Sequence, residues 1–373
     1  MPLPSEWSLV VCGGGSGGHL FPPLAVIEEL RRRQLAPARI LFLTAERSIE
    51  SAILKEQGIE QFALPAVESQ QFRRQPVSAL RTLGKGVRQA VGIIRTLPAP
   101  VILGTGGFGS VPGVLAGRWR KRPIILLEQN LIPGRATSWL ARFVKTVCLS
   151  FSETGRFLPE QIPTQVTGNP VRQSIAFLQT SSVISKKRLL VLGGSQGAAA
   201  INEALIRYAG QHREQLAGWT ILHQTGEADC ARIQNAYHEM KQKAEVAPFF
   251  DNMLEQYERA SIVVTRAGGT SLAEIACAGL PTVIVPYPKS LRNHQLINAR
   301  HFLSRNAAFL VEQGPAARFD AELASAITLL IEDTTQRKTM AAAMKACAVP
   351  EAAEQVCEIL LKTLMDFQQA PNF

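Results

Sequence analysis

Two segments of this sequence share the order apolar strand, glycine-rich turn and helix. In the first, residues 7–12 run into a turn at residues 13–18, and a helix is predicted from about residue 24 to 33. In the second, residues 188–192 run into a turn at residues 193–197. Glycine lets the backbone turn sharply between strand and helix, and such units build parallel sheets that carry helices on both faces. We therefore predict an α/β chain with two doubly wound, Rossmann-like domains.

A third glycine turn, within residues 261–274, has the features of a ligand site. Its apolar strand pattern leads to Gly268-Gly269, and Thr270 and Ser271 lie where a helix is predicted to begin. The unpaired backbone N–H groups of a helix start form a ready site for phosphate. Glu274 lies one turn further, where a carboxylate can reach the hydroxyls of a ribose. The alternative is a capping box, Ser271-x-x-Glu274, which only stabilises the helix.

The composition limits the class of protein. The chain has 373 residues, of which 46% are hydrophobic, and this is enough for two globular domains. No apolar run approaches the length of a membrane span, and the N-terminus lacks the pattern of a signal peptide. Six cysteines without C-x-x-C spacing indicate a reducing cytoplasm, with neither disulfides nor a zinc site. The net charge of +10 favours an anionic partner.

The first glycine turn also matches a dinucleotide fingerprint. Gly13, Gly15 and Gly18 satisfy the pattern G-x-G-x-x-G, and Glu46 follows the next predicted strand, where an NAD site has its acidic ribose ligand. An NAD-dependent oxidoreductase is therefore an alternative function. That alternative leaves the second glycine-rich half of the chain unexplained, and His19, directly after the glycines, is not part of the fingerprint.

The segment from residue 69 to 127 contains no acidic residue and ten basic ones. A basic surface beside an apolar face, with Phe72 and Trp119 as aromatic anchors, is typical of a site that meets anionic lipid. The alternatives are a solvated basic helix whose apolar stripe packs on the core, and a nucleic-acid surface, for which no motif is present. The apolar residues at roughly helical spacing are Leu80, Leu83, Val87, Val91 and Ile94. The basic residues are Arg73, Arg74, Arg81, Lys85, Arg88, Arg95, Arg118, Arg120, Lys121 and Arg122.

Polar residues follow another buried strand pattern, at residues 123–127, which ends in Glu128-Gln129-Asn130. Open α/β sheets bind their ligands at such carboxyl ends of strands. The segment 168–172 has the character of a domain boundary, because the chain beyond it is polar and turn-rich before the strand pattern restarts. The predicted organisation is an N-terminal domain at residues 1–168, a second domain at residues 169–351, and a C-terminal helix at about residues 352–373 that packs back on the first domain.

Five motifs, present in this order, carry a resemblance to a known family. They are residues 13–19 (Gly-Gly-Gly-Ser-Gly-Gly-His), 128–130 (Glu-Gln-Asn), 168–172 (Gly-Asn-Pro-Val-Arg), 193–197 (Gly-Gly-Ser-Gln-Gly) and 266–274 (Arg through Glu). Together they resemble the MurG family of bacterial glycosyltransferases over nearly the whole chain. The resemblance implies a GT-B fold, in which two Rossmann-like domains face a cleft.

The same resemblance implies a reaction and its partners. The reaction is an inverting, metal-independent transfer of N-acetylglucosamine from UDP-N-acetylglucosamine to lipid I, the undecaprenyl-linked acceptor, which yields lipid II for peptidoglycan synthesis. It implies no cofactor, no nucleic acid, and a peripheral place on the anionic, cytoplasmic face of the plasma membrane. The sequence agrees on the metal, because it contains no D-x-D pair to hold a magnesium-bound diphosphate.

The resemblance implies roles for single residues as well. In the second domain, Glu274 would bind the ribose and the backbone of Phe250 the uracil. The diphosphate would lie against Ser195, Gly269, Thr270 and Ser271. The sugar would contact Asn130, His294 and Gln295, and Arg172 would reach the nucleotide from the hinge between the domains.

The first domain would supply the groups that complete the cleft: Ser16, Gly17, Gly18 and His19. Two residues are candidates for the general base, His19 and Glu128, and the sequence leaves the choice open. Two other functions also stay open. One is a related GT-B transferase that acts on another lipid, such as a diacylglycerol; the motifs at 168–172 and 193–197 argue against it. The other is a non-catalytic sensor of nucleotide sugars, against which the presence of His19 and Glu128 argues.

Overall fold

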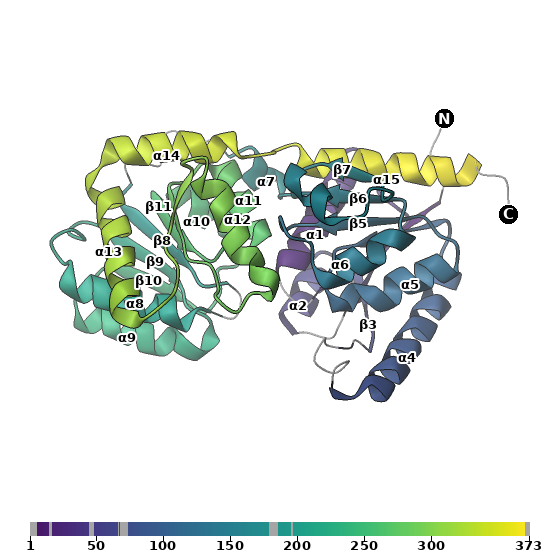
Figure 1. Ribbon diagram of the computed structural model, residues 1–373, viewed down its shortest axis with the longest axis horizontal. Helices are drawn as coiled ribbons and strands as arrows, with labels where there is room; N and C mark the ends of the chain where they lie inside the picture. The colour runs from purple at the N-terminus through teal and green to yellow at the C-terminus, as the bar shows by residue number, and fades with distance from the viewer. Residues whose placement is uncertain are drawn as a thin grey trace. The chain divides into compact units, whose positions relative to one another are not determined.

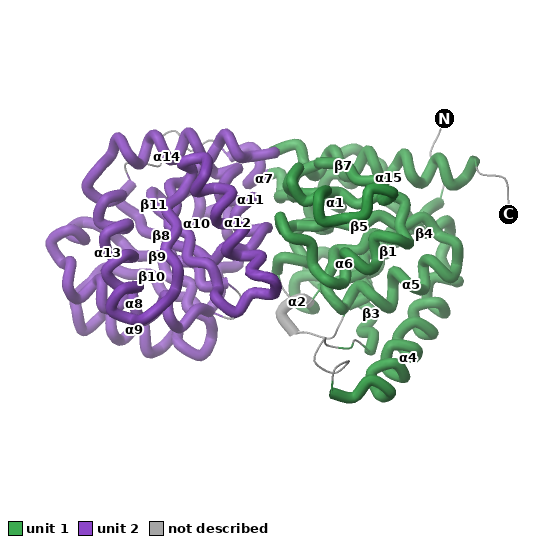
Figure 2. Tube along the Cα trace, viewed as in Figure 1, with its two compact units in different colours: residues 1–173, 350–373 green, residues 174–349 purple. Residues whose placement is uncertain are grey.

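The structure, a computed structural model, describes residues 6–14, 17–44, 48–65, 67, 74–178, 186–194 and 197–369. The chain divides into two compact units (Figure 2). Unit 1 comprises Met1–Gln173 and Pro350–Phe373, and unit 2 comprises Ser174–Val349. The sequence-based boundaries, after residues 168 and 351, lie within a few residues of these divisions. The C-terminal helix, α15 (Ala352–Gln369), belongs to unit 1.

The described residues of unit 1 form a seven-stranded sheet in the order β3-β2-β1-β4-β5-β6-β7 (Figure 1). All of its strand pairs are parallel. The central strands are buried along their whole length, as expected for a sheet covered on both faces. The strands are β1 (Ser8–Cys12), β2 (Arg39–Thr44), β3 (Glu60–Ala63), β4 (Pro100–Gly104), β5 (Ile124–Glu128), β6 (Thr146–Leu149) and β7 (Thr164–Val166).

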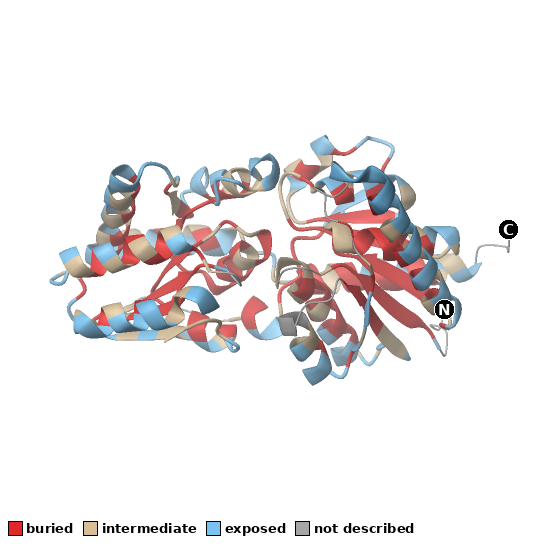
Figure 3. Ribbon diagram, turned by 90° about the horizontal axis from the view of Figure 1, so that it is seen from below, coloured by how far each residue is buried: buried red, intermediate tan, exposed pale blue. Residues whose placement is uncertain are grey.

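Unit 2 repeats this plan with a six-stranded parallel sheet over its described residues, in the order β10-β9-β8-β11-β12-β13. Figure 3 shows the central strands of both sheets as buried and the outer faces of the helices as exposed. The two sheets confirm the predicted pair of doubly wound α/β domains. The strands are β8 (Arg188–Leu192), β9 (Thr220–Gln224), β10 (Ala244–Ala247), β11 (Ile262–Thr265), β12 (Thr282–Ile284) and β13 (Ala308–Leu310).

Helices connect the strands within each unit. In unit 1 these are α1 (Gly17–Arg32), α2 (Ser48–Glu56), α4 (Pro76–Arg95), α5 (Val111–Trp119) and α6 (Arg135–Leu140). In unit 2 they are α8 (Ala199–Gln211), α9 (Cys230–Glu239), α10 (Met253–Arg259), α11 (Gly269–Ala278), α12 (His294–Leu303), α13 (Ala316–Glu332) and α14 (Thr334–Ala346). The short α7 (Gln173–Ala176) spans the division between the units.

The first helix, α1, begins seven residues earlier than predicted, at Gly17 instead of about residue 24. The prediction was wrong because Pro22 and Pro23 are poor helix residues, since each removes a backbone donor and crowds the preceding turn. Both prolines lie inside the helix and are buried. The burial of their rings favours the helix more than the low helix propensity of proline disfavours it. Because the helix begins at Gly17, His19 lies on its first turn.

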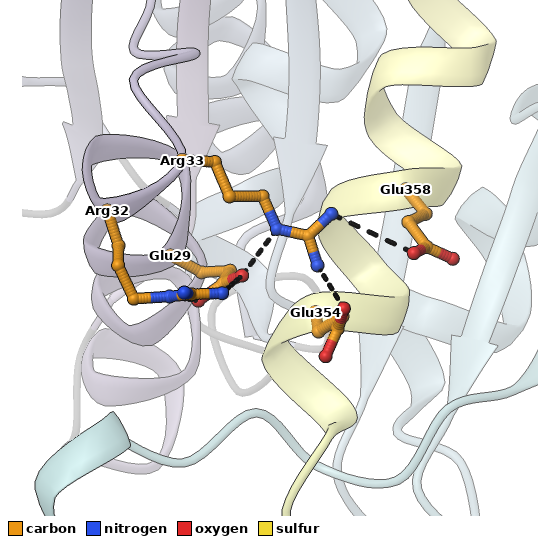
Figure 4. A network of polar contacts seen from close by, with 5 residues as sticks. All are labelled: Glu29, Arg32, Arg33, Glu354 and Glu358. Carbon is orange, nitrogen blue, oxygen red and sulfur yellow. Dashed lines mark hydrogen bonds and ion pairs between the residues drawn. The ribbon is translucent and has the colours of Figure 1, made fainter.

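The C-terminal helix α15 packs on α1 through an apolar face and a charged edge. Its buried side chains, including Leu360, join the same core as the strands of unit 1. At the edge, Arg33 donates to Glu29 and to Glu354, at 2.5 Å each, and lies 3.8 Å from Glu358 (Figure 4). Hydrogen bonding to arginine outweighs the burial of the Glu29 carboxyl and lowers its pKa. These contacts attach the last helix to the first one.

Candidate active site

His19 is held by a backbone carbonyl at the end of β4. Its Nδ1 lies 2.7 Å from the carbonyl oxygen of Thr105. Because a carbonyl only accepts hydrogen bonds, Nδ1 carries the proton, and Nε2 is the acceptor nitrogen of the neutral ring. The backbone of Gly107 lies beside that nitrogen, where a Cβ atom would come within 3.4 Å of Nε2. Gly106 and Gly107 both have positive φ, so the turn after β4 depends on glycine to pass this close to the ring.

Glu128, the other candidate base, holds a loop together. The carboxylate is buried and accepts from the backbone N–H groups of Asn130 and Gly134, each at 3.0 Å, and from the Asn130 side chain at 3.2 Å. Burial raises the pKa of the Glu128 carboxyl, although these hydrogen bonds act in the opposite direction. The carboxylate therefore orients Asn130, and the geometry favours His19 over Glu128 as the base.

One backbone oxygen, that of Thr105 after β4, joins the first turn of α1 to the residues that follow β5. The side-chain amide of Gln129, which is buried, donates to the Thr105 carbonyl at 3.1 Å, the same oxygen that accepts from His19. Two of the motifs found in the sequence, 13–19 and 128–130, are thus neighbours in unit 1. Arg172 also lies against α1, with its guanidinium 4.8 Å from the centre of the Phe21 ring.

In unit 2, the third glycine turn leads into α11 without a side-chain cap. The N-cap residue is Gly268, and Ser271 is the third residue of the helix. The capping-box alternative for Ser271 and Glu274 is therefore wrong, since Ser271 does not cap this helix. Glu274 is buried, and its carboxylate accepts from the hydroxyl of Tyr257 at 2.9 Å. Tyr257 orients the carboxylate, a role that the sequence analysis missed.

The start of α12 is fastened to the loop before α11. The side-chain oxygen of Gln295 accepts from the backbone N–H groups of Ala267 at 3.3 Å and Tyr287 at 2.9 Å. The side-chain amide nitrogen of Gln295 can still donate hydrogen bonds. The neighbouring His294 has its Nδ1 2.7 Å from the carbonyl oxygen of Leu291, and burial lowers the pKa of its imidazole.

Arg266 is a cation beside the start of α11, and the sequence analysis quoted it only as part of a motif. Its guanidinium donates to the carbonyl oxygens of Val285 at 3.2 Å and Pro286 at 3.3 Å, and to the side chain of Gln313 at 3.0 Å. Burial lowers its pKa. These acceptors are neutral, so the positive charge remains to attract an anion at the helix start.

The remaining predicted site residues divide into three groups. Gly17 and Gly18 open α1, and Gly269 and Thr270 open α11. The backbone of Phe250 is predicted to meet the uracil, and its N–H donates to the side-chain oxygen of Gln224 at 3.0 Å. Outside the described residues lie Ser16 and Ser195, and with them Gly15, Glu46, Phe72 and Arg73. Among the residues that are described, no group of three or more His, Cys, Asp or Glu side chains is placed to hold a metal ion.

Two domain families match the chain. The N-terminal domain of glycosyltransferase family 28 matches residues 9–149, and its C-terminal domain matches residues 188–356. These matches cover most of unit 1 and most of unit 2, so the chain has the domain pair of that family in the expected order.

Full-length relatives give the same result. A protein from Nitratidesulfovibrio vulgaris Miyazaki F is 37% identical, with 94% of this chain and 95% of the relative covered. A protein from Syntrophotalea carbinolica is 35% identical, with 94% and 97% covered. Both are named UDP-N-acetylglucosamine–N-acetylmuramyl-(pentapeptide) pyrophosphoryl-undecaprenol N-acetylglucosamine transferase.

Solved structures agree with the sequence relatives. The crystal structure of MurG from Acinetobacter baumannii matches with a TM-score of 0.73 and 26% identity, covering 96% of this chain and 100% of that one. The predicted GT-B architecture is therefore confirmed, with its two parallel-sheet units. The chain belongs to the MurG family of glycosyltransferase family 28.

Proposed function

We propose that this protein transfers N-acetylglucosamine from UDP-N-acetylglucosamine to lipid I and so forms lipid II. Family membership supports this function, because the full-length relatives bear the name of that reaction. The observation that carries it to this chain is the position of His19, whose acceptor nitrogen lies beside a glycine turn at the carboxyl ends of the strands of unit 1. Membership of this family argues against an oxidoreductase that uses NAD.

In the proposed reaction, the acceptor is a hydroxyl group of the muramyl sugar. His19 Nε2 takes the proton of that hydroxyl as its oxygen attacks C1 of N-acetylglucosamine, on the face opposite UDP. The bond between C1 and the diphosphate oxygen breaks, and UDP leaves with the electron pair, so the anomeric configuration inverts. General-base assistance suits this step because a neutral hydroxyl is a weak nucleophile.

The departing UDP gains negative charge, and unit 2 offers groups to stabilise it. Gly269, Thr270 and Ser271 supply the backbone N–H groups of the first turn of α11, and Arg266 adds a fixed positive charge next to them. Such preorganised groups stabilise charge that develops in the transition state. We assign the ribose to Glu274 and the donor sugar to Gln295 and its neighbours. Metal-independent transfer is part of this proposal.

Direct binding and transfer test the function. Thermal-shift measurements should show stabilisation by UDP-N-acetylglucosamine, less by UDP-glucose and none by NAD. Radiolabelled UDP-N-acetylglucosamine incubated with a lipid I analogue should give labelled lipid II in the presence of EDTA. Stabilisation by NAD alone, or transfer to diacylglycerol in place of lipid I, would contradict the proposal.

We also propose that unit 1 meets the cytoplasmic face of the plasma membrane as a peripheral protein. Among the described residues, no helix is long and apolar enough to cross a membrane. The apolar stripe of α4 supports a membrane-binding surface less strongly than the sequence analysis predicted. Four of its five positions pack on or in the core of unit 1: Leu83, Val87, Val91 and Ile94. The fifth, Leu80, is 61% exposed, and Val77 one turn before it is 62% exposed.

The exposed apolar residues have basic neighbours. On α4 and just before it, Arg74, Arg81, Lys85 and Arg88 are all exposed. Near the end of α5, Trp119 is 76% exposed. A pocket of about 420 Å³ in unit 1 is lined by basic side chains, including Arg118, Arg122 and Lys145, together with Phe143, Phe367 and one acidic residue, Asp366. Apolar side chains with basic neighbours suit a surface that meets anionic lipid.

Vesicle binding tests the membrane surface. Replacing Arg74, Arg81, Lys85 and Arg88 by glutamine should weaken binding to anionic vesicles by about 1 kcal/mol per residue. The difference should shrink as salt rises, because screening weakens exposed charges. Replacing exposed Lys241 and Lys243 of unit 2 by glutamine serves as the control. If vesicle binding changes neither with the substitutions on α4 nor with salt, the proposed membrane surface is refuted.

A further inference from the structure

The segment at the end of β9 lies between two parts of the proposed donor site. On one side, the N–H of Gly193, in the glycine turn after β8, donates to the carbonyl oxygen of Gln224 at 3.3 Å. On the other side, the N–H of Thr225 donates to the carbonyl oxygen of Ala247 at 3.0 Å, at the end of β10. The family resemblance implies that the glycine turn after β8 meets the diphosphate, and the chain after β10 leads to Phe250, whose backbone it implies meets the uracil. The sequence motif His223-Gln224-Thr225-Gly226 therefore joins the two.

The side chain of Gln224 makes a second bridge between the same two parts. Its amide nitrogen donates to the carbonyl oxygen of Gly194 at 3.1 Å, and its amide oxygen accepts from the N–H of Phe250 at 3.0 Å. The residue is only 4% exposed. The orientation of the amide is determined, because a carbonyl can only accept and an N–H can only donate. One side chain thus satisfies a backbone group on each side.

The glycine turn also packs directly on this segment. Gly197 has a φ of +75°, and a Cβ atom there would lie 2.1 Å from the carbonyl oxygen of Thr225. The side chain of Asn202, on α8, donates to that oxygen at 3.0 Å and accepts from His223 at 3.1 Å. Asn202 and His223 are fully buried. The described glycines of the turn are therefore joined to the end of β9, and the side chain of Gln224 is the group that reaches from there to the N–H of Phe250.

We propose that Gln224 is a positioning residue that couples the diphosphate half of the donor site to its uracil half. This inference rests on the proposed function. The two halves must be spaced to match a nucleoside diphosphate, and Gln224 touches a backbone group in each. A neutral amide does this without adding charge, whereas an ionised carboxylate would repel both the Gly194 carbonyl and the diphosphate.

Calorimetric titration with uridine and with UDP distinguishes coupling between the two halves of the site from a purely structural role of Gln224. In Gln224→Met, which keeps the volume and loses both hydrogen bonds, UDP should bind about tenfold more weakly, because the two halves of the site are no longer held at the spacing that a nucleoside diphosphate needs. Uridine meets only one half of the site, so its affinity should change far less. With saturating donor, kcat should stay close to the wild-type value while the donor KM rises.

A matched control lies at the other end of the same strands. Gln242 donates from its side-chain amide to the carbonyl oxygens of Trp219 and Lys243, just before β9 and β10. Gln242→Met should lower the melting temperature without changing the ratio of UDP to uridine affinity. Equal weakening of UDP and uridine in Gln224→Met, or no weakening of either, would overturn the inference. A wild-type protein that fails to bind UDP would instead overturn the proposed function.

Gln224→Glu gives a second test that does not depend on the methionine variant. The ionised carboxylate cannot donate to Gly194, but the protonated acid again offers one donor and one acceptor in the same shape. UDP affinity relative to wild type should therefore recover as the pH falls. A relative affinity that is independent of pH would contradict the role of the Gly194 hydrogen bond.

Discussion

Each unit contains one histidine and one carboxylate that are candidates for a role in the proposed reaction, and the two histidines differ in how far they are buried. In unit 1, His19 is half-buried, whereas Glu128 is buried and accepts hydrogen bonds from the backbone of the loop that follows it. In unit 2, His223 is fully buried, and Glu274 is oriented by the hydroxyl of Tyr257. The histidine is the candidate for chemistry in unit 1, whereas the carboxylate is the candidate for ligand binding in unit 2.

The two histidines differ in what holds their ring nitrogens. His223 has Nδ1 2.9 Å from the hydroxyl of Tyr237 and Nε2 3.1 Å from the side-chain oxygen of Asn202. Because Asn202 donates through its nitrogen to Thr225, its oxygen accepts, so Nε2 of His223 carries the proton. Burial lowers the pKa of His223 to about 3. This histidine stays neutral at working pH and has a structural role; His19, with its acceptor nitrogen beside a glycine turn, is suited to take a proton.

The largest effect is expected from His19→Ala. General-base assistance contributes about 10²–10⁴-fold, so kcat should fall by that factor. Donor affinity should change much less, because most of the proposed donor contacts belong to unit 2. A pH–rate profile is the deciding measurement: the acidic limb of kcat should disappear in the variant. Retention of that limb together with lost donor affinity would move the base to another residue.

The next effect is expected from Glu128→Ala, and it should be one of stability. The substitution leaves the half-buried N–H groups of Asn130 and Gly134 without their acceptor. Such a group costs about 1–3 kcal/mol when it is fully buried, so these two half-buried groups should lower the free energy of unfolding of unit 1 by about 2–4 kcal/mol. Urea titration measures it. A stable variant that loses the acidic limb of kcat would reverse the roles of His19 and Glu128.

Glu274→Gln should weaken binding of UDP-N-acetylglucosamine by about 1.5–3 kcal/mol, the range for a hydrogen bond to a charged group. Tyr257→Phe should have a smaller effect in the same direction, because it only loosens the carboxylate. Calorimetry with donor and with UDP measures both. Unchanged donor affinity, with a lower melting temperature, would leave Glu274 a structural residue like Glu128.

The smallest effect concerns the pH dependence of unit 2. The pKa of His223 is about 3 in the folded protein and about 6.5 in the unfolded chain, so the unfolded chain binds more protons between these values. The stability is full above pH 6.5 and falls by about 1.4 kcal/mol per pH unit below it, or about 2 kcal/mol at pH 5. Urea titrations at pH 7.5 and 5 should show this loss, and His223→Gln should reduce it. An equal loss in the variant would assign it to other groups.

The sequence predicted the start of α11 more reliably than the surroundings of α4. Gly268, Gly269 and Glu274 belong to one strand–turn–helix segment, so their positions follow from neighbours in the chain. In α4, the spacing of the apolar residues predicted the helix, yet that spacing is the same for a stripe on the core and a stripe on lipid. In the tertiary structure, Leu83, Val87, Val91 and Ile94 pack against the rest of unit 1 and not toward lipid.

The sequence by itself determined the two doubly wound domains, the glycine turns and the family, because each depends on residues close together in the chain or on motifs in order. Only the tertiary structure decided what each polar side chain does. His19 meets Thr105 across 86 residues, and Tyr257 meets Glu274 across 17. A buried histidine or carboxylate takes its role from the donors and acceptors around it, and residues distant in the sequence supply them.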